Sequence, residues 1–455
     1  MSIDAAIAVT RFGMGARKGE LNSAASDPRG WVLEQLANPA NAQIKDASLP
    51  NTKQAVEATL AHFQKRRDLQ KQAKQSGDKK ALQMHNRTHR QAFVKEVAAR
   101  NLHAARTPYG FMERWARFWS NHFTVSVRKP ELLRIVGPHE RDAIRAFAFG
   151  RFEDLLTKAV LHPAMLIYLD NQKSFGPNTP IAMRRKLGLN ENLAREILEL
   201  HTVGVEGGYG QKDVEEFARA LTGWTVGSPK LRSRKIGETV FEERLHEPGD
   251  RTVLGVTYRE AGAVQALAIL KELARHPATA NHIATKLARH FIADDVSRRS
   301  IKALKRAFEE TDGDLSEVAK TLISLEDAWQ PAPRKFKTPE EMLISSARLL
   351  GVQPVYGRGA RRVYQSLGQS PFTAPSPDGW SDEAAAWAGP DAIKKRLEWA
   401  NRTARLSAPN HVPLDFLADA VGALASERTR SAIALAESRQ QGLTLALMSP
   451  EFQRR

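Results

Sequence analysis

Hydrophobic residues recur along most of this chain at intervals of three and four, which is the period of an amphipathic helix. In the stretch Asn190–Trp224, Leu193, Ile197 and Leu200 share one helical face. Gly204 follows and can close the helix, because glycine readily adopts the left-handed conformation found just after helix ends. The same period continues before and after this stretch. The sequence therefore predicts a mainly α protein with a large helical bundle-like body.

The period changes near residues 235–258, where apolar positions alternate weakly on both sides of the turn-forming segment His246–Asp250. Such alternation is typical of paired strands. We therefore predict a small β-hairpin excursion from the helical body. The predicted organisation is N-terminal capping helices over 1–50, a basic helical arm over 51–106, and a main helical body over 107–455 that carries the β excursion at 225–258. We expect these parts to form one integrated domain.

Composition restricts the class of protein. The chain has 455 residues, no cysteine and a formal net charge of +17. The lack of cysteine excludes disulfides and thiolate metal sites. The N-terminal residues lack the basic start and long apolar segment of a secretory signal, and the longest nearly apolar run, Ala261–Leu270, is too short to span a bilayer. We therefore expect no membrane span and a cytoplasmic location, with the periplasm as the alternative.

Much of the positive charge lies in the predicted arm. Between Ala61 and Arg106, twelve Lys or Arg residues accompany only three acidic residues. Basic residues alone would suit binding to nucleic-acid phosphates. Phe63, however, is the only aromatic residue of the arm before Phe93, so the platforms on which single-stranded bases stack are lacking. We therefore favour a solubilising helical hairpin over a nucleic-acid-binding arm.

Two histidines of the arm have the spacing of metal ligands on one helical face. His85 and His89 are separated by four residues, as in helical metal sites. The neighbouring Arg87 and Arg90 would repel a cation, and no glutamate follows His85 as it does in metalloproteases. We therefore expect these histidines to lie on a solvated face.

The main candidates for chemistry flank the apolar face of the Asn190 helix. Asn192, Arg195, Glu196 and Glu199 fall within an arc of about 100° on that helix. Carboxylates can transfer protons or hold a hard cation, and a guanidinium can hold an anionic group. The alternative to a functional site is a purely structural helix pair whose charges are solvated or paired with one another. The sequence does not decide between these two hypotheses.

Further candidate site residues lie at the C-terminal ends of two predicted helices that precede the Asn190 helix. An aromatic helix ends at Asn121 and His122, and another ends at Asp170 and Asn171, before a stretch of nineteen residues with the features of a lid. We expect these groups to line one cleft. The predicted catalytic residues are His122, Asp170, Glu196, Glu199 and His201. The predicted substrate-binding residues are Asn121, Asn171, Asn192, Arg195 and Arg219.

A metal or cofactor is not specified by these residues. Glu196 and His201 are five positions apart, whereas carboxylate-bridged metal sites in helical bundles use Glu-x-x-His. The sequence also lacks the GxSxG, HExxH and Walker motifs of well-known enzyme classes. Metal binding is therefore a minor hypothesis, and the cofactor is left open.

Several motifs together resemble one bacterial family. The segments WSNHF at 119–123, HPAMLIYLDN at 162–171, NENLAREILELHTVG at 190–204, QKDVEEFARALTGW at 211–224 and HEPGDRTVLG at 246–255 are similar to successive signatures of the family catalogued as domain of unknown function 1800. The order and spacing match from Arg11 to Trp380. The resemblance implies a largely helical fold and no established activity. It also implies frequent pairing in genomes with the family catalogued as domain of unknown function 1501, which resembles phosphatases and sulfatases.

Three functional hypotheses follow. The first is an enzyme with a carboxylate- and histidine-lined cleft that acts on an anionic or polar substrate. The second is a non-catalytic accessory or chaperone-like partner of a protein of the second family. The third is nonspecific nucleic-acid binding through the basic arm. An enzyme should place His122, Asp170, Glu196 and Glu199 around one concave pocket, whereas an accessory protein should show them paired or packed in a filled interior.

Overall fold

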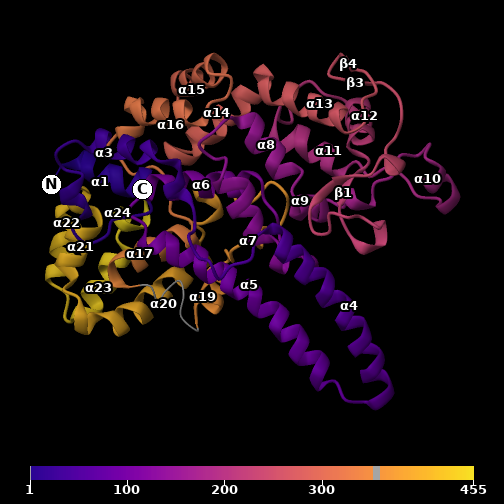
Figure 1. Cartoon of the computed structure of the whole chain (residues 1–455). Coiled ribbons are helices and arrows are strands. Elements are labelled where there is room, and N and C mark those ends of the chain that lie inside the picture. The colour runs from indigo at the N-terminus through magenta and orange to yellow at the C-terminus, as the bar shows by residue number, and fades with distance from the viewer. Residues whose placement is uncertain (1, 352–358) are drawn as a thin grey trace.

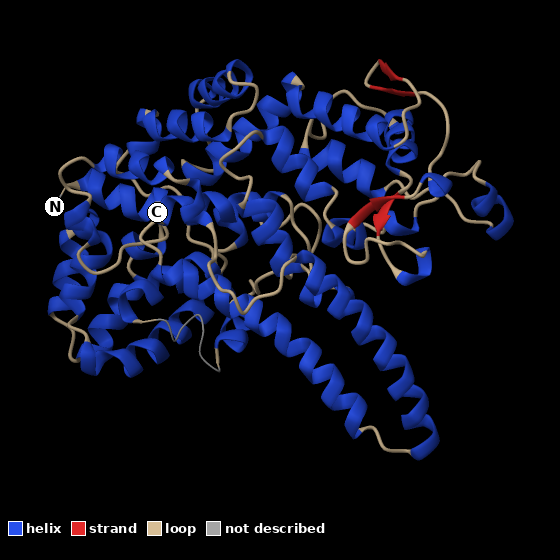
Figure 2. Ribbon diagram, in the orientation of Figure 1, coloured by secondary structure: helices blue, strands red, loops and turns tan. Residues whose placement is uncertain are grey.

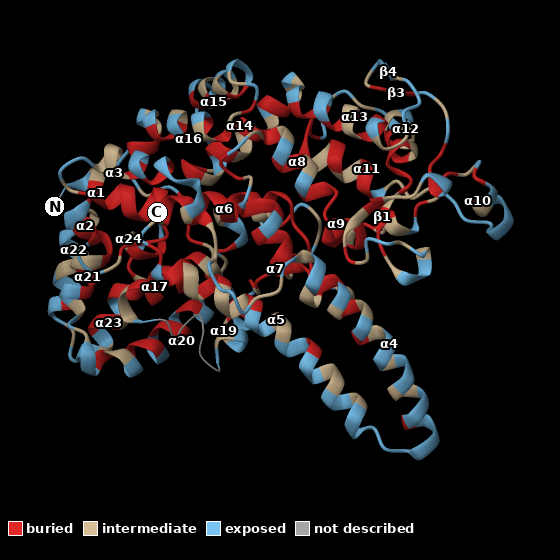
Figure 3. Cartoon of the chain, viewed as in Figure 1, coloured by how far each residue is buried: buried red, intermediate tan, exposed pale blue. Residues whose placement is uncertain are grey.

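The computed structural model describes residues 2–351 and 359–455 and confirms the mainly α prediction (Figures 1 and 2). Within these residues, strands occur only in two small two-stranded antiparallel sheets. Buried apolar side chains form a larger core that draws on residues 5–329 and a smaller core made mostly by residues 342–452. The helical body is thus built around two neighbouring cores, and the arm extends from it (Figure 3).

Helix α6, Gly110–His122, runs through the larger core. Trp115 is fully buried, with its ring centroid 5.8 Å from that of Phe111 and 5.9 Å from that of Phe291. Its indole Nε1 donates a hydrogen bond to the Ala148 carbonyl at 2.7 Å, which satisfies the one polar atom that burial would otherwise leave unpaired. The predicted aromatic core helix is therefore present, and it fixes the position of the residues at its C-terminal end.

The chain begins with a helix that packs against the larger core. Helix α1, Ile3–Ile7, continues into a π-helical segment, η1, Ala8–Phe12. Residues 5–12 are buried, whereas Ile3 is 39% exposed. Arg11 donates hydrogen bonds to the carbonyls of Ala328 and Ala332 at 2.6 and 2.9 Å. These bonds tie the first segment of the chain to a stretch far along the sequence.

Other helices of the segment 20–324 contribute to the larger core, apart from α10, which lies outside it. The π-helical segments η5 and η7 extend α7 and α11. The bounds are α2 Glu20–Ser23, α3 Pro28–Glu34, α7 Val136–Pro138, η5 His139–Arg145, α8 Phe152–Val160, α9 Pro163–Tyr168, α10 Pro180–Arg185, α11 Asn192–Glu196, η7 Ile197–His201, α12 Gln211–Leu221, α13 Ala263–Arg275, α14 Pro277–Phe291, α15 Arg298–Glu310 and α16 Leu315–Ser324.

The two small sheets confirm the β excursion. Strand β1, Trp224–Val226, pairs with β2, Thr239–Phe241, and β3, Arg251–Val253, pairs with β4, Val256–Tyr258. The first sheet therefore recruits the residues immediately after α12, while the second is a tight hairpin. Gly255 lies in its turn with φ +79°, a conformation that glycine adopts at no steric cost.

The smaller core is formed by the C-terminal helices. Helix α17 starts with a capping box, in which the side chains of Thr338 and Glu341 accept hydrogen bonds from each other's backbone N–H groups. The bounds are α17 Pro339–Leu350, α19 Ala360–Ser366, α20 Pro390–Ser407, α21 Pro413–Val421, α22 Glu427–Ala434, α23 Arg439–Met448 and α24 Pro450–Gln453.

The predicted arm is an antiparallel helical hairpin. Helix α4, Thr52–Ser76, and helix α5, Lys80–Arg106, lie side by side and project away from the body (Figure 1). Asn51 and Gln54 form a capping box at the start of α4, and Gly77 ends it with φ +76°. Exposed residues predominate toward the tip (Figure 3).

The histidines of the arm do not lie on a solvated face. The ring of His62 stacks between those of His85 and His89, with centroid separations of 4.2 and 3.9 Å. His89 is buried, and its Nε2 donates a hydrogen bond to the carbonyl of Pro130 in the body at 2.9 Å. The prediction of solvated histidines is therefore wrong for His89. The i, i+4 spacing instead places two rings against the neighbouring helix.

No helix in residues 2–351 or 359–455 has the length and apolar character needed to cross a membrane.

Truncation of Trp115 tests the role of the aromatic core. Replacement of Trp115 by alanine should lower the free energy of unfolding by about 3–5 kcal/mol, because it removes buried surface and leaves a cavity. Urea denaturation measures this change. Leu435 is 84% exposed, so Leu435→Ala should change the free energy by less than about 0.5 kcal/mol. Equal effects of the two substitutions would contradict the described core.

Candidate functional site

The two predicted catalytic histidines lie in the filled interior. His122 ends α6 and His201 ends η7, and both are at most 1% exposed. The Nε2 of His122 donates to the carbonyl of His201 at 3.2 Å. Burial is the main cause that lowers the pKa of each ring, to about 3 for His201. These rings are neutral packing groups whose surroundings are aromatic side chains and neighbouring histidines.

The next two candidates are engaged by their neighbours. Asp170 forms ion pairs with Lys129 and Lys173, each at 2.8 Å. Burial would raise the pKa of Asp170, but hydrogen bonds from the two lysines outweigh it and lower that pKa. Asn171 is buried, and its side-chain amide donates to the carbonyls of Leu221 and Trp224 at 3.1 and 2.8 Å. Asn171 therefore ties the end of α9 to the start of β1.

The arc on the Asn190 helix is partly paired. Arg195 contacts Glu191 at 2.8 Å and Gln211 at 2.8 Å, and Asn192 is exposed. Arg219 of α12 lies 3.4 Å from Glu216 and, on its other side, 3.6 Å from the buried Glu247. The predicted guanidinium ligands thus already have carboxylate partners.

Glu196 and Glu199 have fewer close polar contacts than the other predicted charged site residues. Glu196 is half-buried, and burial followed by the charges of Glu199 and Asp378 raises its pKa. The Tyr209 hydroxyl approaches Glu199 at 3.5 Å. The charge of Asp378 acts on Glu196, which places the Pro377–Trp380 loop near the Asn190 helix. Of the predicted constellation, the structure thus brings Glu196 close to Glu199 and leaves His122 in the interior.

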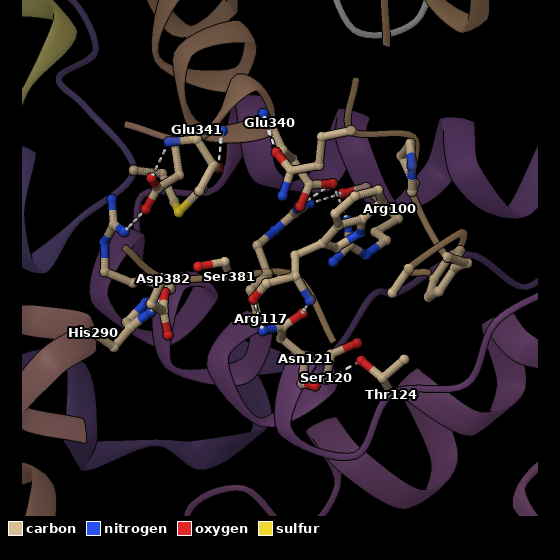
Figure 4. Close-up of a pocket in the computed structure, with 18 of the residues that line it drawn as sticks. Arg100, Arg117, Ser120, Asn121, Thr124, His290, Glu340, Glu341, Ser381 and Asp382 are labelled. Carbon is tan, nitrogen blue, oxygen red and sulfur yellow. Dashed lines mark hydrogen bonds and ion pairs between the residues drawn. The ribbon is translucent and has the colours of Figure 1, made fainter. Parts of the chain in front are cut away.

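A different cavity, of about 90 Å³, lies between α6, the end of α14, the start of α17 and the loop after α19 (Figure 4). Of the ten predicted site residues, only Asn121 lines it. Its polar and charged lining residues are Arg100, Arg114, Arg117, Ser120, Asn121, Thr124, His290, Thr338, Glu340, Glu341, Gln369, Ser381 and Asp382. Apolar side chains complete the lining, so the cavity is mixed in character and holds charges of both signs.

Asn121 fixes the loop that closes one side of this cavity. Its Oδ1 accepts a hydrogen bond from the backbone N–H of Trp380 at 2.8 Å, and its Nδ2 donates to the Trp380 carbonyl at 2.9 Å. Gly379 has φ +88°, and a Cβ there would lie 2.6 Å from the Asn121 carbonyl oxygen. Only glycine fits this close approach. The Pro-Asp-Gly-Trp motif is thus a fixed rim that rests on the end of α6.

A histidine–aspartate pair stands at the edge of the cavity. The Nδ1 of His290, near the end of α14, lies 2.7 Å from Oδ1 of Asp382 (Figure 4). Burial would raise the pKa of Asp382, but the adjacent His290 and the nearby Lys335 hold it at about 2. Burial also lowers the pKa of His290, against the influence of Asp382. A carboxylate beside a neutral imidazole requires the hydrogen to be on Nδ1, so Nε2 carries the free lone pair. That Nε2 is buried without a hydrogen-bond partner.

The wall opposite this pair is a buried ion-pair network. Glu113 accepts from Arg117 at 2.5 Å and from Arg145 at 2.7 Å, and Arg145 also lies 2.8 Å from Glu140. Burial would raise the pKa of Glu113, but Arg145 and Arg117 hold it well below its ordinary value. In the same way Arg100 and Arg145 lower the pKa of Glu140 to about 2. Both carboxylates are therefore charged at neutral pH.

Two adjacent glutamates extend this network to other parts of the fold. Glu340 pairs with Arg100 of the arm and with Arg117 of α6, the latter at 2.9 Å. Glu341 pairs with Arg114 of α6 and, at 2.8 Å, with Arg455. The arm, the central helix and the C-terminal helices thus meet at one charged seam beside the cavity.

One known family matches nearly the whole chain. The sequence model of a family described as "Protein of unknown function (DUF1800)" matches residues 7–454. The chain belongs to the DUF1800 family. No curated protein and no solved structure gives a significant match. Membership of DUF1800 confirms the resemblance drawn from the motifs at 119–123, 162–171, 190–204, 211–224 and 246–255.

The sequence patterns did not predict the pair formed by His290 and Asp382. His290 and Asp382 are 92 positions apart, so no local spacing connects them. A usable signal did exist for the network, because Glu113, Arg114 and Arg117 interrupt a helix whose aromatic residues require burial on several faces. Within residues 2–351 and 359–455, no group of three or more histidine, aspartate or glutamate side chains is arranged to hold a metal ion.

Removal of one charge should show how much an unpaired ion in this network costs the folded state. Glu113→Gln keeps the side-chain size but leaves Arg145 and Arg117 short of a buried counter-charge. The free energy of unfolding should fall by about 3–5 kcal/mol. Glu309→Gln is the control, because Glu309 forms only an exposed pair with Lys305 and should cost less than about 1 kcal/mol. Chemical denaturation compares them, and a small loss for Glu113→Gln would contradict the network's role.

The buried histidines predict acid sensitivity. Burial lowers the pKa of His139 and His282 to about 4 and that of His201 to about 3, from 6.5. Between these values the unfolded chain binds protons that the folded chain does not, so stability is complete above about pH 6.5 and falls as the pH drops toward 4. Glu96 and Glu196, with raised pKa values, act in the opposite sense but are fewer.

Urea midpoints between pH 4.5 and 7.5 measure this slope. His282→Gln removes one of the titrating groups and should flatten the decline, whereas His411→Gln, which removes a half-buried imidazole outside this group, should leave the decline unchanged. A midpoint that stays constant or rises toward pH 4.5 would show that the buried rings do not control acid stability.

Proposed function

We propose that this protein is an enzyme that uses His290 as a general base on a small polar or anionic substrate group. The observation that carries the proposal is the pair formed by His290 and Asp382 beside a cavity lined by charged, polar and apolar side chains. Asp382 accepts the Nδ1 hydrogen at 2.7 Å, which orients the ring and leaves Nε2 able to take a proton. The same division of roles operates in enzymes whose histidine activates a hydroxyl group or water.

The cavity suits a compact polar group. A volume of about 90 Å³ holds several water molecules or a substrate group of similar size. Because the Nε2 of His290 is buried, the segment that carries Trp380 and Asp382 must shift as a substrate enters. Ser381 in this segment is exposed, which places the rim at the protein surface. The reaction class that these features support is activation of water or of a substrate hydroxyl.

The charged wall restricts the substrate further. The guanidinium of Arg100 lies 5.0 Å from the centroid of the Phe372 ring, and Arg117 and Arg114 line the same cavity. Each of these arginines already pairs with Glu340 or Glu341. A substrate anion would therefore share arginines with carboxylates, which favours a group with at most one or two negative charges over a polyanion.

The sequence-predicted constellation supports a second candidate function. His122 and His201 are packed in the interior, and Asp170, Arg195 and Arg219 have charged partners. This is the arrangement expected of a non-catalytic accessory protein, such as a partner of the family catalogued as domain of unknown function 1501. Under this alternative, the cavity beside His290 would have no chemical role.

Substitution at the pair distinguishes the two candidates. Hydrolysis of chromogenic phosphate, sulfate and carboxylic esters should be tested with the purified full chain. If His290 is the base, His290→Gln should lower turnover by about 10²- to 10⁴-fold. Asp382→Asn should also lower it strongly, because an amide no longer selects the required tautomer. The rate should fall at acidic pH, where His290 becomes protonated.

His411→Gln is the matched control for this experiment. His411 is also half-buried, and its Nδ1 contacts the carbonyl of Ser407 in the C-terminal helices. Its substitution should leave turnover unchanged. Turnover that survives in both His290→Gln and Asp382→Asn would rule out the proposed base. Absence of turnover, together with co-purification of a protein of the second family, would favour the accessory function.

A further inference from the structure

The arm is held firmly at its base and carries no apolar covering toward its tip. At the base, Arg141 pairs with Glu96, and Arg134 donates to Nδ1 of His89 at 2.8 Å. Nearer the tip, Ala73 is buried and Leu69 is half-buried, while most other positions are exposed. The α4 helix of 25 residues and the α5 helix of 27 residues are each about 40 Å long at 1.5 Å per residue. The arm is thus a rigid projection.

The outer part of the arm is strongly basic. Residues 62–95 contain ten Lys or Arg residues and only two acidic residues, Asp68 and Asp78. None of these ten cations forms an ion pair with any residue that the structure describes. Nine of the ten are exposed, and Arg66 is half-buried. The ten are Lys65, Arg66, Arg67, Lys71, Lys74, Lys79, Lys80, Arg87, Arg90 and Lys95.

Five of these ten cations lie on one side of the hairpin or on the helix faces directed away from the partner helix. Arg67, Lys71 and Lys74 follow the i, i+4, i+7 spacing and therefore lie along one face of α4. Arg67 follows the half-buried Arg66 by one residue, and Arg90 follows the buried His89 by one residue, so each side chain is rotated by about 100° around its helix axis from an inward-facing position. Because α4 and α5 are antiparallel, these two rotations direct both side chains to the same side of the hairpin. Arg87 follows Arg90 toward the outer edge of α5.

The chemistry of this surface selects among acidic partners. Interfaces between proteins are depleted in lysine and have aromatic or apolar centres, but the exposed large apolar residues of the arm are limited to Met84 and Val94. Helices that lie on membranes present a wide apolar face, which the arm also lacks. Single strands require stacking aromatics. An interface that is polar, rich in cations and salt-dependent is typical of contacts with the backbone of a nucleic-acid duplex.

We propose that this side of the arm binds the phosphate backbone of double-stranded nucleic acid, without base readout. The contacts are between the unpaired Lys and Arg side chains of α4 and α5 and phosphates along one face of the duplex. This binding is independent of the cavity beside His290, so failure of one proposal leaves the other standing.

Binding of the full chain to a fluorescent 30-base-pair duplex, measured by anisotropy over a series of salt concentrations, tests the proposal. The logarithm of the association constant should fall linearly with the logarithm of salt concentration. The variant Arg67→Gln, Lys71→Gln, Lys74→Gln, Arg87→Gln, Arg90→Gln should bind more weakly. Its salt slope should be less steep by about 0.9 for each phosphate contact removed.

A matched control removes the same number of exposed charges from the body. Lys212→Gln, Lys271→Gln, Lys302→Gln, Arg402→Gln, Arg405→Gln changes residues that are all exposed and outside the arm. This control should retain the affinity and slope of the unaltered chain. Circular dichroism should show that both variants remain helical, because every substituted side chain is on the surface.

Three results would overturn the proposal. The first is no duplex binding at 50 mM salt. The second is equal weakening in the arm variant and the body control, which would assign binding to net charge. The third is arm-dependent binding to phosphatidylserine-containing vesicles without binding to the duplex, which would assign the arm to an anionic membrane surface.

Discussion

The buried charges beside α6 are the constraint on which the arrangement of the chain depends. Glu113 and Glu140 share Arg145, while Glu340 joins Arg100 of the arm to Arg117 of the central helix. Burying so many ions is costly, and the cost is offset only when each charge meets a close partner of opposite sign. Segments far apart in the sequence must therefore dock together in one register. The network selects this assembly more than it adds to stability, because apolar packing around Trp115 already provides a large hydrophobic contribution.

The fold class follows from features that act locally. Helical period, the Thr338 capping box, and the breaks at Gly77 and Gly204 are set by neighbouring residues, so the sequence predicts them well. The burial of residues 5–12 is different, because a short run rich in alanine has the same local preference whether it is exposed or buried. Within this segment, Arg11 donates hydrogen bonds to carbonyls more than 300 residues away. Tertiary contacts decide such a case.

The candidate site shows the same limit more sharply. Helical geometry correctly groups Glu196 with Glu199, and the pKa of Glu196 is raised partly by that proximity. Helical geometry does not say which other helix packs against the face that carries these two glutamates. Asn121 was identified as polar and at the end of a core helix, and it does line the cavity. The partners that give the cavity its chemical character, His290 and Asp382, come from segments that show no motif in common. Only their meeting in space reveals them.

The π-helical segment η7 explains what two neighbouring histidines, His122 and His282, contribute to the fold. Its wide turn ends with the carbonyls of Leu200 and His201 directed away from the helix ladder, where His282 and His122 each donate a hydrogen from Nε2. Both imidazoles therefore work as terminators for an irregular helix end. A cation bound at either Nε2 would displace that hydrogen and uncover a carbonyl in a dry interior. Selection for a properly ended helix is thus sufficient to retain these histidines, and their abundance around η7 is a consequence of backbone geometry.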